Sequence, residues 1–157
     1  MAQMTTHDEA TARESAAAWE SLFRAQVALM RRFQRDDVWG GLSMREYDVL
    51  FTLSTAPGHA ARLRELADNS LLTQPSLSRL VERLEADGLV RREPVAGDGR
   101  GVRVVLTDSG LRTQREIGRR HVASIHRFVG GALGADDLAT LTRLTERLRA
   151  AQRSIPD

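Results

Sequence analysis

A change of hydrophobic periodicity within one short segment constrains the fold of this chain more than any other feature. From residue 73 to residue 87 the apolar side chains recur every three or four positions, the spacing of one face of an α-helix. Gly88 ends that helix, and beyond it apolar residues alternate with polar ones, as in a half-buried β-strand. The segment therefore predicts a helix followed by a β-hairpin. The apolar helical positions are Leu77, Leu80, Val81 and Leu84.

The opposite face of this helix is polar and begins with small side chains. Thr73 is placed as the N-cap, and Pro75 is tolerated in the first turn because the amides there have no helical partner. Small hydroxyl groups allow close approach to a surface, and a helix N-terminus favours an anion such as phosphate. Arg79 can reach a guanine edge or hold a phosphate, although a capped surface helix with solvated charges is an alternative interpretation. The positions that we assign to a DNA contact are Thr73, Gln74, Pro75, Ser76, Ser78, Arg79 and Arg83.

The hairpin favours the nucleic-acid interpretation. Its second strand covers residues 102–106, residues 89–92 are the expected partner strand, and a glycine-rich loop at 97–101 connects them. Arg100 is expected at the tip, where the negative potential of a DNA minor groove attracts a guanidinium group. Asp98 is placed either to orient that guanidinium or to form a turn with its own backbone. Arg103, on the second strand, completes the residues that we assign to DNA.

Three motifs resemble those of the multiple-antibiotic-resistance regulator (MarR) family. The resemblance runs from about Ala10 to the C-terminus. It implies a dimeric winged-helix transcription factor whose affinity for DNA is changed by a small ligand. The motifs are Leu42-Ser43-x-x-Glu46-Tyr47, Leu63-x-x-Leu66-Ala67 and Asp98-x-Arg100-x-x-x-Val104-x-Leu106-Thr107-x-x-Gly110.

We therefore expect a mainly α fold with a small β-wing, in which a winged helix-turn-helix lies between N- and C-terminal dimerisation helices. Residues 1–157 are expected to form a single domain, with dimerisation helices at about 10–38 and 107–153 and the DNA-binding lobe at about 42–106. Apolar stripes on the terminal helices are typical of interhelical interfaces, although packing within one subunit is the alternative. The stripes are Ala16, Trp19, Phe23, Gln26, Met30 and Phe33; Leu111, Gly118, Val122, Ile125, Val129 and Ala132; and Leu138, Leu141, Leu144 and Leu148.

Local signals place the elements that precede the recognition helix. Ser43 and Glu46 have the spacing of a capping box, which starts a second helix. Pro57-Gly58 ends it. Residues 62–67 are then expected to form the short first helix of the helix-turn-helix, with Asn69-Ser70 as the turn.

Composition bounds the other possibilities. All 23 basic residues are arginine and the net charge is only +2, so the pI of 10.2 reflects a small excess of groups that titrate far above neutrality. Residues 61–120 carry 12 arginines and 9 acidic residues, net +3, whereas residues 1–60 are net −2. The absence of cysteine excludes disulfides and thiolate metal sites. No run of about 18 apolar residues indicates a membrane span and the N-terminal residues are polar, so we expect a cytoplasmic protein.

Sequence motifs of catalysis and cofactor binding are missing. There is no nucleophile elbow, Walker loop or dinucleotide-binding glycine run, so we expect neither an enzyme nor a cofactor. His121 and His126 lie about 140° apart around a helix, so they do not form a two-histidine metal face.

The resemblance implies an effector site between the dimerisation helices and the winged lobe. Aromatic side chains there could form its walls, and a basic side chain could meet a carboxylate or phenolate. We therefore expect a small aromatic or phenolic effector, although ordinary core or surface roles stay open for each residue. The candidates are Trp19, Phe23, Tyr47 and Phe51 for the walls and Arg24 and His121 for the charge.

The predicted function is sequence-specific regulation of transcription, as a ligand-responsive repressor that binds double-stranded DNA. A homodimer would place its two recognition helices in successive major grooves, about 34 Å apart, with the wings in flanking minor grooves. The operator would then be an inverted repeat. One alternative is a winged-helix protein-interaction module without direct DNA binding, and a more distant one is an enzyme that acts on the effector.

Overall fold

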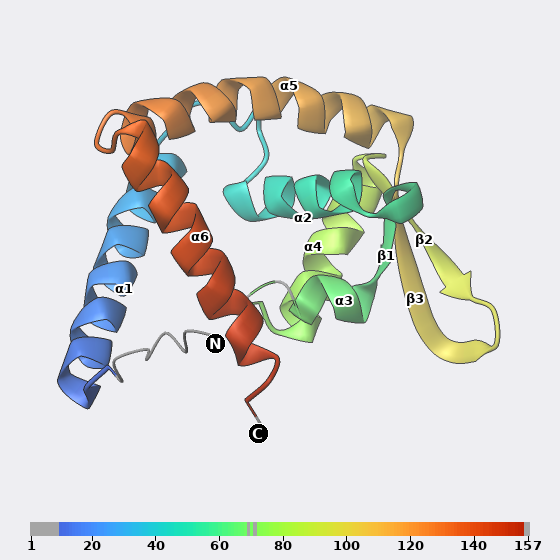
Figure 1. Ribbon diagram of the computed structural model, residues 1–157. Helices are drawn as coiled ribbons and strands as arrows, with labels where there is room; N and C mark the ends of the chain where they lie inside the picture. Colours follow the sequence, from blue (N-terminus) through green and yellow to red (C-terminus); the bar gives the residue numbers. More distant parts are fainter. Residues whose placement is uncertain (1–9, 69, 71, 156–157) are drawn as a thin grey trace, which may run out of the picture. The chain divides into compact units, whose positions relative to one another are not determined.

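The computed structural model describes residues 10–68, 70 and 72–155 (Figure 1). The chain forms two compact units, one up to Arg35 and one from Asp36 onward, and each is described by itself. The described part of the first unit is helix α1 (Ala12–Gln34). Thr11 and Glu14 form a capping box at its start, and no residue of this 23-residue helix is buried.

The second unit contains the remaining helices and one small sheet. This arrangement confirms the expected mainly α fold with a β-wing. Across the described ranges no helix is both long and apolar enough to cross a membrane. The elements are α2 (Met44–Thr55), the 3-10 turn η1 (Pro57–His59), β1 (Ala60–Arg62), α3 (Leu63–Asp68), α4 (Gln74–Ala86), β2 (Val90–Val95), β3 (Asp98–Leu106), α5 (Asp108–Ile125), the π-turn η2 (His126–Gly130) and α6 (Ala135–Gln152).

The predicted starts of α2 and α4 are confirmed by their capping contacts. The Glu46 amide donates to Ser43 Oγ at 3.2 Å, and Glu46 Oε2 accepts from the Ser43 amide at 2.8 Å. In α4 the Ser76 amide donates to Thr73 Oγ1 at 3.4 Å, and Gly88 follows the helix with a positive φ of 72°. These contacts satisfy amides that have no partner within the helix.

The apolar stripe of α4 lies at the centre of the core. All four predicted positions are buried, and they pack with side chains from α2, α3 and the two long strands. Leu50 and Leu53 of α2 are fully buried in the same cluster. The remaining members of this core are Val49, Leu66, Leu77, Leu80, Val81, Leu84, Leu89, Val90, Val104 and Leu106.

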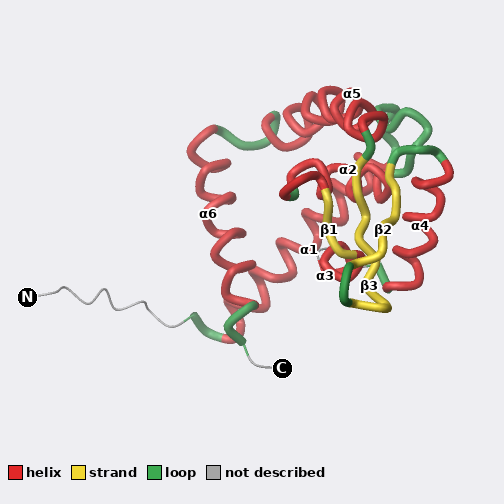
Figure 2. Tube along the Cα trace, turned by 90° about the vertical axis from the view of Figure 1, so that its right-hand side faces the viewer, coloured by secondary structure: helices red, strands yellow, loops and turns green. Residues whose placement is uncertain are grey.

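The sheet has three strands, one more than predicted. Its order is β1-β3-β2, with both pairings antiparallel (Figure 2). β1 was missed because residues 60–62 are too few to show a strand period, and the predicted helix 62–67 starts one residue later, at Leu63. Arg62 belongs to β1, and its amide donates to Glu65 Oε2 at 2.8 Å at the start of α3. Asn69 lies outside the described residues, while Ser70 follows α3 and donates its amide to Ala67 O at 3.0 Å.

The tip of the wing differs from the predicted loop at 97–101. The turn is formed by Ala96 and Gly97, whose φ is 78°, and β3 already begins at Asp98. Residues 99–101 instead form a bulge, because Pro94 pairs with Val102 while its neighbour Val95 pairs with Asp98. The expected alternation also ends early, since Val105 is buried like the residues on either side of it.

A close crossing joins the base of the wing to the start of α5. Thr107 is the N-cap of α5, and its Oγ1 also donates to Gly88 O at 2.7 Å. The Thr107 amide donates to Leu89 O at 3.1 Å. A Cβ placed on Gly110 would collide with that same carbonyl oxygen and lie 2.7 Å from Leu106 Cδ1. Only glycine therefore fits where α5 passes the wing.

Aromatic residues fill the contact between α2 and α5. The rings of Trp39 and Tyr47 are buried, with centroids 5.4 Å apart. The imidazole centroid of His121, on α5, lies 4.8 Å from the centroid of the Trp39 ring and 5.6 Å from that of the Tyr47 ring. The two helices approach closely at Gly118, where an added Cβ would lie 3.2 Å from Tyr47 Oη. Burial lowers the pKa of His121 below its ordinary value of 6.5, and the negative charge of Asp36 partly opposes this shift.

Replacing Gly110 with alanine is expected to destabilise the second unit, because backbone and a packed side chain occupy the space that the new Cβ needs. The free energy of unfolding should fall by about 1–3 kcal/mol, the usual range for overpacking, as measured by denaturant titration. Gly99→Ala is the matched control, because nothing lies within 4 Å of a Cβ there. Equal stabilities of the two variants would contradict the close crossing.

Replacing His121 with glutamine is expected to flatten the dependence of stability on pH. Because the folded state lowers the pKa of His121, the imidazole is harder to protonate there than in the unfolded chain. The free energy of unfolding of the wild type should therefore decrease as the pH falls below about 6.5. Chemical denaturation at several pH values measures this slope. A slope in His121→Gln as steep as that of the wild type would refute the assignment.

Candidate nucleic-acid interface

The first turns of α4 present the predicted polar surface. Gln74, Pro75 and Ser76 are exposed, and Thr73 Oγ1 donates to Ser76 Oγ at 3.0 Å. Ser78 is half-buried, and Arg79 is exposed. The structure thus brings these predicted residues together at the N-terminal end of α4, next to the positive end of the helix dipole, with Pro75 and Arg79 on the face opposite the buried stripe.

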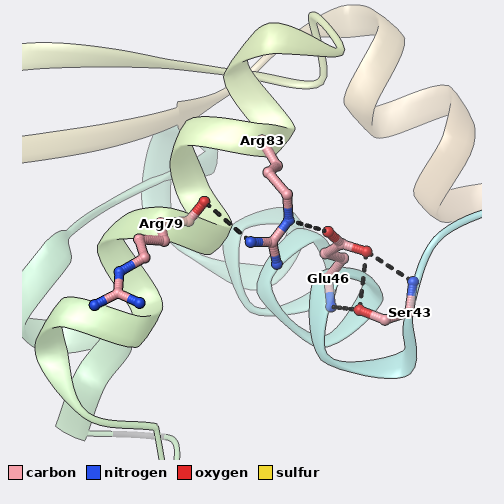
Figure 3. A network of polar contacts seen from close by, with 4 residues as sticks. All are labelled: Ser43, Glu46, Arg79 and Arg83. Carbon is pink, nitrogen blue, oxygen red and sulfur yellow. Dashed lines mark hydrogen bonds and ion pairs between the residues drawn. The ribbon is translucent and has the colours of Figure 1, made fainter.

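Arg83 is engaged by protein groups. Its Nε lies 3.2 Å from Glu46 Oε1, and its Nη1 donates to Arg79 O at 3.5 Å. Figure 3 shows Arg83 reaching from α4 toward the first turn of α2, while the Arg79 side chain points away from this network. The ion pair of Glu46 with Arg83 was not predicted, because nothing in the sequence relates residue 46 to residue 83.

Glu46 is held in its ionised form by several donors. Burial raises the pKa of its carboxyl group, but hydrogen bonds from the Ser43 amide and hydroxyl and from Arg83, together with the arginine charge, outweigh that effect. The net result is a lowered pKa. Glu46 is therefore a fixed negative charge at neutral pH.

The wing carries predicted residues on both sides of its bulge. Asp98 forms an ion pair with Arg62 of β1, with Nη1 and Oδ2 3.4 Å apart. Its carboxylate also covers Gly101, where a Cβ would lie 2.6 Å from Asp98 Oδ2. The backbone of Arg100 belongs to β3, but its side chain lies outside the described part of the structure. Arg103 is exposed in the middle of the sheet, in register with Arg62 and Glu93.

A second ionic contact, missed from the sequence, ties the wing to α4. Arg92 of β2 donates its amide to Glu85 Oε1 at 2.8 Å and its Nε to Glu85 Oε2 at 2.7 Å. Its Nη1 also lies 3.5 Å from Glu82 Oε1. The hydrogen bonds from the Arg92 amide and side chain lower the pKa of Glu85. α4 and the wing are thereby connected along β2, which lies beside α4 in Figure 2.

The predicted effector residues fall into two groups. Trp19, Phe23 and Arg24 lie on α1, where the two rings stack with centroids 5.9 Å apart and Arg24 Nε pairs with Glu20 at 2.6 Å. Tyr47, Phe51 and His121 lie in the second unit, where Tyr47 stacks on Phe51 at 6.3 Å. Trp39, which the sequence analysis did not select, contacts both Tyr47 and His121. Trp39 belongs to none of the apolar stripes in the sequence, so no periodic pattern indicated that it would contact these rings.

Comparison with known proteins identifies relatives of this chain. The sequence profile of the MarR family matches residues 40–101, which include the helix-turn-helix and most of the wing. The HTH-type transcriptional regulator PecS of Dickeya dadantii is 35% identical over 83 residues, which span 52% of this chain but only 49% of PecS.

Two crystal structures from Streptomyces coelicolor are similar over nearly their whole length. AbsC, a MarR family transcriptional regulator, is 31% identical with a TM-score of 0.76, over 94% of this chain and 99% of AbsC. Sco3205, a MarR family transcriptional regulator solved in complex with DNA, is also 31% identical, with a TM-score of 0.72 over 91% of this chain and 89% of Sco3205.

The profile match lies on the elements that carry the exposed face of α4 and the wing, and the structural match extends to the flanking helices. Members of this family regulate transcription and are not enzymes, in agreement with the absence of catalytic motifs. The chain belongs to the MarR family of DNA-binding, winged helix-turn-helix transcriptional regulators.

Proposed function

We propose that the chain acts as a homodimeric, ligand-responsive repressor that binds an inverted-repeat operator. The observation that carries the proposal is the division of α4 into a fully packed apolar stripe and an exposed polar face led by Thr73, Ser76 and Arg79. Such a helix is anchored on one side and free to enter a major groove on the other. An operator that overlaps a promoter blocks polymerase, which makes repression the expected outcome.

The wing supports contact with the adjacent minor groove. β2 and β3 form a hairpin that projects beyond the helices of the lobe (Figure 1). Arg100 lies in the bulged part of this hairpin, next to the tip turn. Arginines at such tips are drawn to the negative potential of a narrow minor groove. We assign this role to Arg100, with Asp98 and Arg103 beside it.

The terminal helices support a dimer. α1 has no buried residue over its 23 positions, although its apolar stripe includes Trp19, which is 61% exposed. α6 has none either, and its stripe residues Leu141, Leu144 and Leu148 are exposed. Water-exposed stripes at helical spacing are stabilised by burial against a partner helix. We therefore assign about 10–38 and 107–153 to the dimerisation helices, whose apolar stripe residues form the interface, and about 42–106 to the DNA-binding lobe.

The proposed effector site is built from aromatic side chains of the second unit. The aromatic group of Tyr47, Phe51 and His121 lies where α2 of the lobe meets α5. A small aromatic or phenolic anion that bound there more tightly in one state of the dimer would shift the spacing of the two recognition helices. Release from DNA would follow from that difference in affinity.

Selection of bound fragments from random DNA tests the proposed function directly. We expect the purified protein to enrich an inverted repeat whose half-sites are about one helical turn, roughly 34 Å, apart. The logarithm of the binding constant for that site should fall steeply and linearly with the logarithm of the salt concentration, because phosphate contacts release counterions. Absence of enrichment, together with salt-independent binding to a protein from the same source, would favour the protein-interaction alternative.

Alanine substitutions distinguish a base contact of Arg79 in the major groove from a minor-groove contact of Arg100. Arg79→Ala should cost about 1–3 kcal/mol on the selected operator and relax the preference at one base pair. Arg100→Ala should instead weaken binding to all sequences and leave the oligomeric state unchanged. Fluorescence anisotropy on operator and scrambled duplexes measures both, with Arg115→Ala, an exposed arginine of α5, as the control. Undiminished affinity of Arg100→Ala at moderate salt would overturn the wing assignment.

A further inference from the structure

The ion pair between Arg83 and Glu46 joins an exposed side chain to a largely buried one. Arg83 is 60% exposed, whereas Glu46 is only 14% exposed. The two oxygens of Glu46 have separate tasks, because Oε2 accepts from the Ser43 amide and hydroxyl at 2.8 Å each, while Oε1 faces Arg83. Glu46 cannot follow a movement of Arg83 without breaking the capping box of α2. It is therefore a rigid anchor for the arginine.

The position of Arg83 along α4 favours a role other than DNA contact. Arg83 is the tenth of the 13 residues of α4, about 13 Å along the helix axis from Gln74. Recognition helices touch base edges mainly with their N-terminal residues. One turn before Arg83 lies Arg79, whose carbonyl oxygen accepts from Arg83 Nη1 at 3.5 Å. The guanidinium thus bridges α2 and the turn of α4 that carries Arg79.

We propose that Arg83 is a positioning residue that, anchored on Glu46, fixes the rotation of α4 against α2 and hence the direction in which Arg79 leaves the helix. This inference rests on the proposed DNA contact of α4, and it replaces the direct DNA contact expected of Arg83. The buried stripe sets which face of α4 turns inward, and the ion pair adds a directional restraint that non-directional apolar contact does not supply. Glu85, about 200° around the helix from Arg83, holds Arg92 of the wing, so ionic contacts fix α4 from two sides.

Glu46→Gln separates the two roles of Arg83 with little risk to the fold. Glutamine also serves at this position of a capping box, so α2 keeps its N-terminal cap while the ion pair is lost. If Arg83 positions α4, both Glu46→Gln and Arg83→Gln should weaken discrimination between the operator and a scrambled duplex, each by about tenfold. The double variant should be no worse than either single variant, and Arg83→Lys should retain most of the discrimination.

If Arg83 contacts phosphate instead, the two substitutions should change the affinity for DNA in opposite directions. Glu46→Gln would then release Arg83 and strengthen binding, while Arg83→Gln would reduce the slope of log K against log salt by about one. Either result would overturn the inference. Glu116→Gln is the matched control, because it removes an exposed ion pair with Arg120, 3.4 Å apart, on α5.

Hydrogen exchange without DNA distinguishes failure of this inference from failure of the proposed function. Amides of α4 should exchange faster in both Glu46→Gln and Arg83→Gln than in the wild type or Glu116→Gln. If the α4 amides exchange faster in both variants but the wild-type protein selects no DNA, the positioning role is supported and only the proposed function is contradicted. If the exchange rates of the α4 amides in both variants equal those of the wild type, the positioning role is contradicted, whatever the affinity for DNA.

Discussion

Burial of the α4 stripe is the interaction on which the winged lobe depends. Leu77, Val81 and Leu84 are fully buried, and removal of each such side chain from water contributes about 1.5–3 kcal/mol. The exposed ion pairs around them contribute about 0–1 kcal/mol each. Apolar contact therefore supplies most of the stability of the lobe, while the weaker ionic contacts add direction. The same helix can thus be firmly held and still have its outer face oriented by one arginine.

The junction at residues 88–89 connects the other parts of the lobe to this core. The Leu89 amide donates to Leu84 O at the end of α4, and its carbonyl accepts from Thr107 at the start of α5. Thr107 also binds Gly88 O, and Gly110 fits only because it has no side chain. The end of the recognition helix, the base of the wing and the first turn of α5 are therefore fixed by one set of backbone contacts. A displacement of α5 cannot leave the wing and α4 where they were.

The parts of the structure that the sequence predicts are those encoded by neighbouring residues. The caps at Thr73 and Ser43, the stripe of α4 and the pairing of the strand at 89–92 with the strand at 102–106 follow from local spacing, and the structure confirms them. Contacts between distant residues were not predictable in this way. The pair Arg83–Glu46 spans 37 positions, and β1 is defined only by its pairing with β3. The position of the wing turn was predicted wrongly because three glycines between residues 97 and 101 make several turns sterically possible. The register of the two strands determines which of these turns forms.

The irregular edge of the wing has a consequence for how copies of this protein meet one another. β2 is an outer strand of the described sheet, and an open strand edge is a template for pairing with another chain. Pro94 offers no amide on that strand, the bulge begins beside it, and Arg91 and Arg92 bring charge to the same edge. These features disfavour edge-to-edge association of wings. Copies bound at neighbouring sites on one DNA molecule come close together. Even then, these features keep the hairpins of different copies from pairing into a continuous sheet.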